Sequence, residues 1–234
     1  YPSHEREARV SGTPTLGSGR IYQHTDEAVA ESQIAIPAHW PRIAGMDFGW
    51  DHKTAVVWLA WDRDSDTIHL YDAYGAPEQT PMVHSLAIKA RGDWIPMAWP
   101  HDGLQHEKGT GDELKKQYLK YGVKMLPKQA THAPDHTTGQ KEGEGGNSVE
   151  LGITELNERI LTGRFKVAKH LNDWFEEYRL YHRKDGKIVK LNDDFMDATR
   201  YAVMMLRHAK VQAQPQRKAM PGHQITDPAT GVLG

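Results

Sequence analysis

The sequence predicts an α/β fold, with a mixed five-stranded central sheet flanked by helices and an added β-hairpin. Three apolar, β-branched runs follow one another between residues 42 and 74, and their short connections make them an antiparallel meander. Segments with helical spacing then alternate with strand-like runs, which implies parallel strands added to the meander. The Asp-Gly pair within "RKDGKIV" is a two-residue hairpin signal.

The first half of the chain carries start and stop signals for each element. Thr80 and Pro81 suit the N-cap and first position of a helix that Gly92 follows, and Pro127 cuts off the last strand. In chain order the predicted elements are strands at 42–49, 54–62 and 67–74, a helix at 80–91, a strand at 94–100, a helix at 111–122 and a fifth strand at 123–126.

The second half opens with a long loop from Lys128 to Asn147. The loop is rich in Gly, His, Thr and Lys and has no apolar period, which is typical of functional or disordered segments. After it, the predicted elements are a helix from Val149 that ends at Gly163, a short edge-like strand at 164–167, a helix around 171–178, the hairpin at 183–189 and a last helix from about Asp193 to His208.

The ends of the chain differ from its middle. Residues 1–41 are polar, broken by Gly and Pro, and are predicted to be a linker that wraps onto the domain in a fragment of a longer chain. The folded domain is predicted at 42–210. Residues 211–234 are rich in Pro, Gly and Gln and are predicted to be a disordered tail.

Composition limits the function. The net charge is -2, so no global basic field indicates nucleic acid, and a polyanion would be met by a local patch or through metal ions. The absence of cysteine excludes disulfides, thiolate zinc sites and cysteine nucleophiles. No apolar run approaches the roughly 20 residues that span a bilayer. We expect a soluble, cytoplasmic protein with no membrane partner.

Three aspartates fall where the predicted topology brings them together. The element order is that of a ribonuclease H-like fold, in which Asp47 lies on the first strand, Asp102 directly follows the parallel fourth strand, and Asp197 lies in the first turn of the last helix. Converging carboxylates repel one another unless a cation is present, and hard oxygen ligands suit Mg²⁺ or Mn²⁺. Asp51 and the 193–194 pair fit caps or turns better.

The predicted chemistry is metal-assisted hydrolysis of a phosphodiester. Two ions about 3.5–4 Å apart, bridged by Asp47, would let one ion activate water while the other stabilises the leaving oxygen. The three aspartates are therefore the candidate catalytic and metal-binding residues.

Four stretches resemble a known family. "GTPTLGSGRIYQ", "IAGMDFGWDHKTAVVWLAWD", "RGDWIPMAWPHDG" and "NDDFMDATRYAVMM" are similar to the C-terminal nuclease domain of phage terminase large subunits, of the headful-packaging P22 and Sf6 kind, and cover residues 12 to 208. The resemblance implies a metal-dependent endonuclease that cuts concatemeric double-stranded DNA during genome packaging. By that match Asp47, Asp102 and Asp197 are the metal-binding aspartates.

The resemblance also implies partners and a location. The partners are double-stranded DNA, an upstream ATPase domain of the same chain, and the small terminase subunit and portal. The location is the host cell cytoplasm, without a place in the mature virion. No G-x-x-x-x-G-K-[ST] loop occurs in this chain, so the ATPase is expected upstream of it.

Other residues are weaker candidates. His101, beside Asp102, is a candidate auxiliary residue that orients water or contacts a phosphate. Lys128 and Lys141 are candidate DNA-binding residues in the long loop. His132 and His136 have a spacing that suggests zinc on a helix, but Pro134 between them argues against a helix.

Two other functions stay open at this point. The stretch "DFGWDHKT" resembles the phosphate loop of actin-like and sugar-kinase-like ATPases, although the second copy of the motif that such proteins need is missing. A non-catalytic module that docks a packaging motor is the third reading, and it leaves the three acids unexplained.

Overall fold

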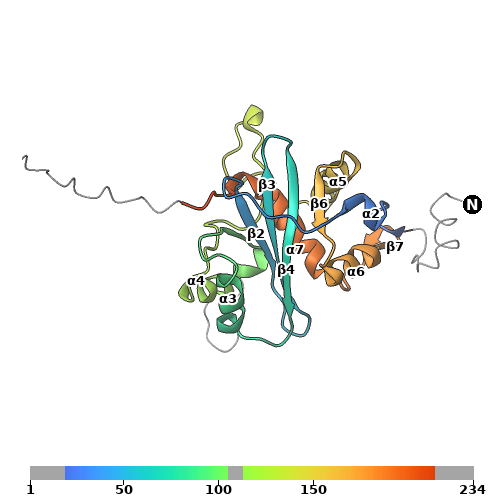
Figure 1. Ribbon diagram of the computed structural model, residues 1–234. Coiled ribbons are helices and arrows are strands. Elements are labelled where there is room, and N and C mark those ends of the chain that lie inside the picture. The colour runs from blue at the N-terminus through green and yellow to red at the C-terminus, as the bar shows by residue number, and fades with distance from the viewer. Residues whose placement is uncertain (1–18, 105–112, 214–234) are drawn as a thin grey trace, which may run out of the picture.

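The structure is a computed structural model that describes residues 19–104 and 113–213 (Figure 1). Its centre is a mixed six-stranded sheet with the order β1-β6-β4-β3-β2-β5, and a two-stranded hairpin lies apart from it. The strands are β1 (Ala30–Glu31), β2 (Arg42–Asp47), β3 (Thr54–Asp62), β4 (Thr67–Ala76), β5 (Met97–Ala98), β6 (Phe165–Ala168), β7 (Arg183–Lys184) and β8 (Lys187–Ile188). The helices are α2 (Asp26–Val29), α3 (Pro81–Lys89), α4 (Leu114–Lys120), α5 (Val149–Leu161), α6 (Asn172–Leu180) and α7 (Asp194–Met204), with 3-10 turns η2 (His101–Leu104), η3 (His136–Thr138) and η4 (Leu206–His208).

The predicted meander and its parallel neighbour are confirmed. Strand β2 pairs antiparallel with β3, and β3 pairs antiparallel with β4. Strand β5 pairs parallel with β2, with Gly45 opposite Ala98. In the hairpin β7–β8, Asp185 and Gly186 adopt positive φ angles of 50° and 76°, as a two-residue turn of this kind requires.

Two strand predictions are wrong in detail. The segment 123–126 forms only an isolated bridge between Met125 and Met97, because Pro127 ends the pairing directly after it. The run at 164–167 is not an edge strand, since β6 pairs with β4 on one side and with β1 on the other. The sheet therefore has six strands instead of the five predicted.

Helices cover both faces of the sheet. Side chains alternate between faces along a strand, so Gly45 and its cross-strand partner Val57 face one side, while Trp58 faces the other. On the first face Gly45 lies directly against the backbone of α7. On the second, the guanidinium of Arg91, just after α3, stacks over Trp58 at 4.8 Å. Helix α6 packs against α7 through a 2.9 Å hydrogen bond from Trp174 to Thr199.

The described part of the predicted linker contributes to the fold. Strand β1 joins the sheet edge beside β6, and Tyr22 and Val29 are buried in the hydrophobic core. Tyr22 stacks on Tyr178 of α6 with 5.4 Å between ring centroids. Residues 1–18 and 214–234, which hold most of the predicted linker start and tail, lie outside the described residues, and the boundaries at 41/42 and 210/211 stay predictions.

Among the helices of the described ranges, none is both long and apolar enough to cross a bilayer.

The close approach of α7 to β2 depends on Gly45. A Cβ atom at this position would overlap the carbonyl oxygen of Ala198 and the side chain of Ala202. We expect Gly45→Ala to lower the free energy of unfolding by about 1–3 kcal/mol, the usual cost of overpacking a core. Urea denaturation would measure it, with Leu161→Ala, 73% exposed, as a control expected within about 0.5 kcal/mol of wild type. An unchanged midpoint for Gly45→Ala would contradict the packing.

Candidate active site

Asp47 is the last residue of β2 and lies on the face that α7 covers. Asp47 is two residues after Gly45, so both side chains leave the same face of the sheet. Ala198, which contacts Gly45, is adjacent in sequence to Asp197. The sheet and helix therefore place Asp47 and Asp197 on facing surfaces, as predicted from the sequence.

Three acids lie at the start of α7, and all are buried. Asp193 occupies the N-cap position but makes no capping hydrogen bond with its side chain, and Asp194 and Asp197 lie in the first turn. The exposed fractions of the three residues are 9%, 6% and 6%. Carboxylates near a helix N-terminus are stabilised by the helix dipole, but burial of several together needs further compensation.

The acids of α7 act electrostatically on Asp47. Burial raises the pKa of Asp47 well above its ordinary value of 3.8, and Asp197, Asp194 and Asp193 raise it further. Lys190 acts in the opposite direction. We refer to these four residues as the acidic cluster. Burial and repulsion from the other three acids disfavour the charged form of Asp47 in the metal-free protein.

Two cationic side chains form ion pairs with Asp197. The Lys190 ammonium lies 2.6 Å from Asp197 Oδ2, and the Arg200 guanidinium lies 3.0 Å from Asp197 Oδ1. Lys190 also lies 2.9 Å from Asp193 Oδ2. Burial would lower the pKa of Lys190, but Asp197 and Asp193 raise it above its ordinary value. The cluster thus carries internal counter-charges from the segment after the hairpin and from α7 itself.

Asp102 lies at the same end of the sheet as Asp47 and is exposed. In the parallel pairing of β2 and β5, Ala44 is opposite Met97, so the same register continued would set Asp47 opposite Pro100. Asp102 follows in η2, where Gly103 packs against Phe48, the residue after Asp47. The predicted parallel strand therefore brings Asp102 to the same end of the sheet as Asp47. His101, in the same 3-10 turn, is also exposed.

The donor set fits a divalent cation. Carboxylate oxygens are hard ligands, and the pKa of Asp47 is raised first by burial and then by the negative charges of Asp197, Asp194 and Asp193, which a cation would offset. Over residues 19–104 and 113–213, no three His, Asp or Glu side chains are already arranged as a metal-binding group. Salt bridges from Lys190 and Arg200 instead hold the oxygens of Asp197.

The long loop has defined contacts. His132 donates its backbone N–H to Gly146 O at 2.9 Å, and Arg207 forms an ion pair with Glu142 at 2.6 Å. Lys128 donates to the Glu142 carbonyl, whereas Lys141 is exposed. The ring of His132 pairs with the Ser148 carbonyl, as expected for a histidine with a structural role. The loop closes on itself and is tied by Arg207 to η4, the 3-10 turn after α7.

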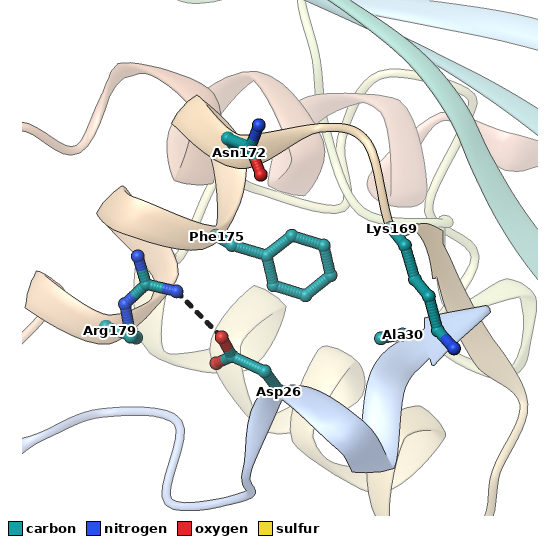
Figure 2. Close-up of a pocket in the computed structure, with 6 residues that line it drawn as sticks. All are labelled: Asp26, Ala30, Lys169, Asn172, Phe175 and Arg179. Atoms are coloured by element: carbon teal, nitrogen blue, oxygen red, sulfur yellow. Dashed lines mark hydrogen bonds and ion pairs between the residues drawn. The ribbon is translucent and has the colours of Figure 1, made fainter. Parts of the chain in front are cut away.

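A separate pocket lies between α6 and the α2–β1 segment (Figure 2). Phe175 points into the pocket, and the Arg179–Asp26 ion pair at 2.7 Å closes one side. The volume is about 160 Å³, and the lining residues are Asp26, Ala30, Lys169, Asn172, Phe175 and Arg179. None of these belongs to the acidic cluster, so the pocket is distinct from the candidate active site.

Sequence reasoning set aside residues that the structure brings into the site. Asp193 and Asp194 fit caps or turns in the sequence, yet both raise the pKa of Asp47. Lys190 lies before α7 and outside any helix, so no helical spacing rule indicates its ion pairs with Asp193 and Asp197. Glu177 lies 18 residues from its backbone partner, Phe195, and no local pattern indicates it.

The order of the sheet and the acidic cluster between β2 and α7 define an RNase H-like domain. The chain belongs to the family described as the terminase RNaseH-like domain, which matches residues 44–206. It is 48% identical to "Terminase, large subunit" of Salmonella phage P22 over 225 residues, 94% of this chain and 43% of that protein. The chain therefore spans less than half of that relative.

Solved structures agree with this assignment. "Structure of P22 Large terminase nuclease domain" matches with a TM-score of 0.74 and 46% identity, over 84% of this chain and 97% of that one. The large terminase nuclease domain of bacteriophage SPP1, solved with bound Mn, matches with a TM-score of 0.53 and 16% identity, over 76% of this chain and 94% of that one. The second match shows the fold alone.

The raised pKa of Asp47 predicts a pH-dependent stability in the metal-free protein. The folded chain binds this proton more tightly than the unfolded chain does, so the carboxylate destabilises the fold only as pH rises from about 3.8 through the raised folded-state value. Asp47→Asn should therefore be more stable than wild type at neutral pH. Each 1 kcal/mol gained would raise Tm by about 2–4 °C for a chain of this size.

The measurement is thermal unfolding of both proteins in chelator across a pH series. Asp51→Asn, at an exposed position in the same loop, is the matched control. A difference between Asp47→Asn and wild type that shrinks as pH rises would contradict the electrostatic account.

Proposed function

We propose that this chain is the nuclease domain of a phage terminase large subunit and cuts concatemeric double-stranded DNA during genome packaging. The observation that carries the proposal is the field of Asp193, Asp194 and Asp197 on Asp47, set in an RNase H-like sheet. The similarity to the P22 nuclease domain supports the same activity here. The site of action is the host cell cytoplasm.

Asp47, Asp102 and Asp197 would hold two divalent ions, Mg²⁺ or Mn²⁺. When bound, the ions supply an activated water and stabilise the leaving oxygen. Asp47 provides a carboxylate fixed by the end of β2, and Asp197 provides one fixed by packing of α7 on Gly45. Bound manganese in the SPP1 nuclease structure supports this choice of ions.

The protein's own residues must rearrange modestly for this to happen. Lys190 is 56% exposed, so its ammonium can move from Asp197 to solvent or to a DNA phosphate when divalent ions take over the charge of the carboxylates. Arg200 is 4% exposed and stays to fix the other oxygen of Asp197. Asp102, exposed in η2, can turn toward the end of β2. His101 is a candidate for contacting a phosphate there.

The partners follow from the family. The chain itself has a net charge of -2, so DNA affinity would come from the metal ions and from lysines such as Lys128 and Lys141. An ATPase domain in the same polypeptide would supply most of the affinity, and the small terminase subunit and portal would supply the assembly.

The first test is cleavage of plasmid DNA by aspartate variants. Asp47→Asn, Asp102→Asn and Asp197→Asn should each lower the rate by at least about 100-fold, because each removes a ligand of the ions that stabilise the transition state. Asp51→Asn is the matched control and should cut at the wild-type rate. Mn²⁺ should support cutting at least as well as Mg²⁺, whereas Ca²⁺ should bind without turnover. Robust cutting in EDTA would refute the metal mechanism.

A second test concerns the long loop. Lys141→Ala should weaken DNA binding and reduce the slope of log affinity against log salt by about 1, the change expected for one lost phosphate contact. Lys89→Ala, in the last turn of α3 on the opposite face of the sheet, is the control and should leave the slope unchanged. Filter binding with the Asp47→Asn variant would avoid cleavage during the measurement. Equal slopes for the Lys141 variant and wild type would show that Lys141 does not contact a DNA phosphate.

A further inference from the structure

Helix α7 starts without a cap of its own. The first N–H groups of a helix have no partner within it and usually bond to the side chain of the N-cap residue. The N-cap residue here is Asp193, and its side chain makes no such bond. The N–H of Phe195, the second residue of α7, instead donates to Glu177 Oε2 of α6 at 2.6 Å.

Glu177 is suited to this role because it is buried and otherwise paired. It is 2% exposed, and its second oxygen, Oε1, accepts a hydrogen bond from Lys53 Nζ at 2.8 Å. The Lys53 ammonium also lies 4.7 Å from the centroid of the Phe195 ring. Lys53 belongs to the loop that follows Asp47, so Glu177 connects that loop to the first turn of α7.

A second contact joins the same two segments. His52 Nδ1 lies 2.6 Å from Asp194 Oδ1, one residue before Phe195. Gly75 of β4 leaves room for both segments, since a Cβ there would lie 2.9 Å from the Lys53 side chain and from the Phe195 ring. The β2–β3 loop, α6 and α7 therefore meet at Glu177 and Phe195.

We propose that Glu177 is a positioning residue for the metal-binding acids. It caps α7 in place of Asp193, whose carboxylate pairs with Lys190 instead, and it fixes the first turn of α7 relative to the strand that carries Asp47. The inference rests on the function proposed above, because the acids that it positions are the proposed metal ligands. Outer-shell contacts of this kind are typically worth about 10–100-fold in metal affinity or activity.

The test compares two neutral side chains of similar length. Glu177→Gln keeps a carbonyl oxygen that can accept from Phe195 N–H, whereas Glu177→Met has no comparable acceptor. Both lose the ion pair with Lys53, so the difference between them isolates the cap. Glu31→Met is the control, because Glu31 has a similar pairing with His69 at 2.8 Å on the far side of the sheet.

Three readouts are expected to change in Glu177→Met and to recover in Glu177→Gln. The Phe195 amide should exchange its hydrogen faster in the metal-free protein. Mn²⁺ affinity measured by calorimetry should fall by about 10-fold or more, and kcat for DNA cleavage should fall similarly with KM unchanged. Glu31→Met should alter thermal stability alone. Equal values for the Gln and Met variants in all three readouts would overturn the cap.

The wild-type protein provides an independent measurement if the Met variant does not fold. The Phe195 amide should exchange slowly for a residue at the second position of a helix, and fast exchange would overturn the proposal. Hydrogen exchange needs neither metal nor DNA. A wild-type protein that cuts no DNA would therefore defeat the proposed nuclease function, while the amide data would still decide whether Glu177 caps α7.

Discussion

The contact between Gly45 and α7 is the constraint on which the rest of the candidate site depends. Because no side chain separates β2 from α7, the backbone of the helix lies directly on the strand. Asp47, two residues after Gly45, and Asp197, the residue before Ala198, are therefore held on facing surfaces of the strand and the helix. Mutual repulsion of the carboxylates is the direct result, and the cationic side chains of Lys190 and Arg200 offset part of it through their ion pairs with Asp197.

The groups that form the candidate site and the groups that stabilise the fold are different residues. A cluster of buried acids weakens the metal-free fold, yet the large core around Trp58, Trp99 and Trp174 tolerates that cost. The design resembles other sites in which strained or repelling groups are held by a rigid scaffold and relaxed by a ligand.

Much of the fold was predictable from local patterns. The meander, helix α3 and the Asp-Gly hairpin have strong short-range signals, and all three are confirmed. The parallel edge was not fully predictable, because whether 123–126 forms a strand depends on tertiary pairing with only two residues of β5. The roles of β1 and β6 also depend on long-range pairing between residues 30 and 167. Glu177 escaped prediction for the same reason.

The placement of β1 has a mechanical consequence. Strand β1 lies at the sheet edge opposite β5 and runs parallel to β6, and Arg20 bridges to His182 just before the hairpin. Tension on the chain before residue 20 would act first on the Arg20–His182 bridge and the Tyr22–Tyr178 stack, and then on the β1–β6 ladder. The load would pass through β6 and the Tyr22–Tyr178 stack into α6, which carries Glu177. A force applied at the β1 edge of the sheet would thus reach α6 and, through the hydrogen bond from Phe195 to Glu177, the first turn of α7.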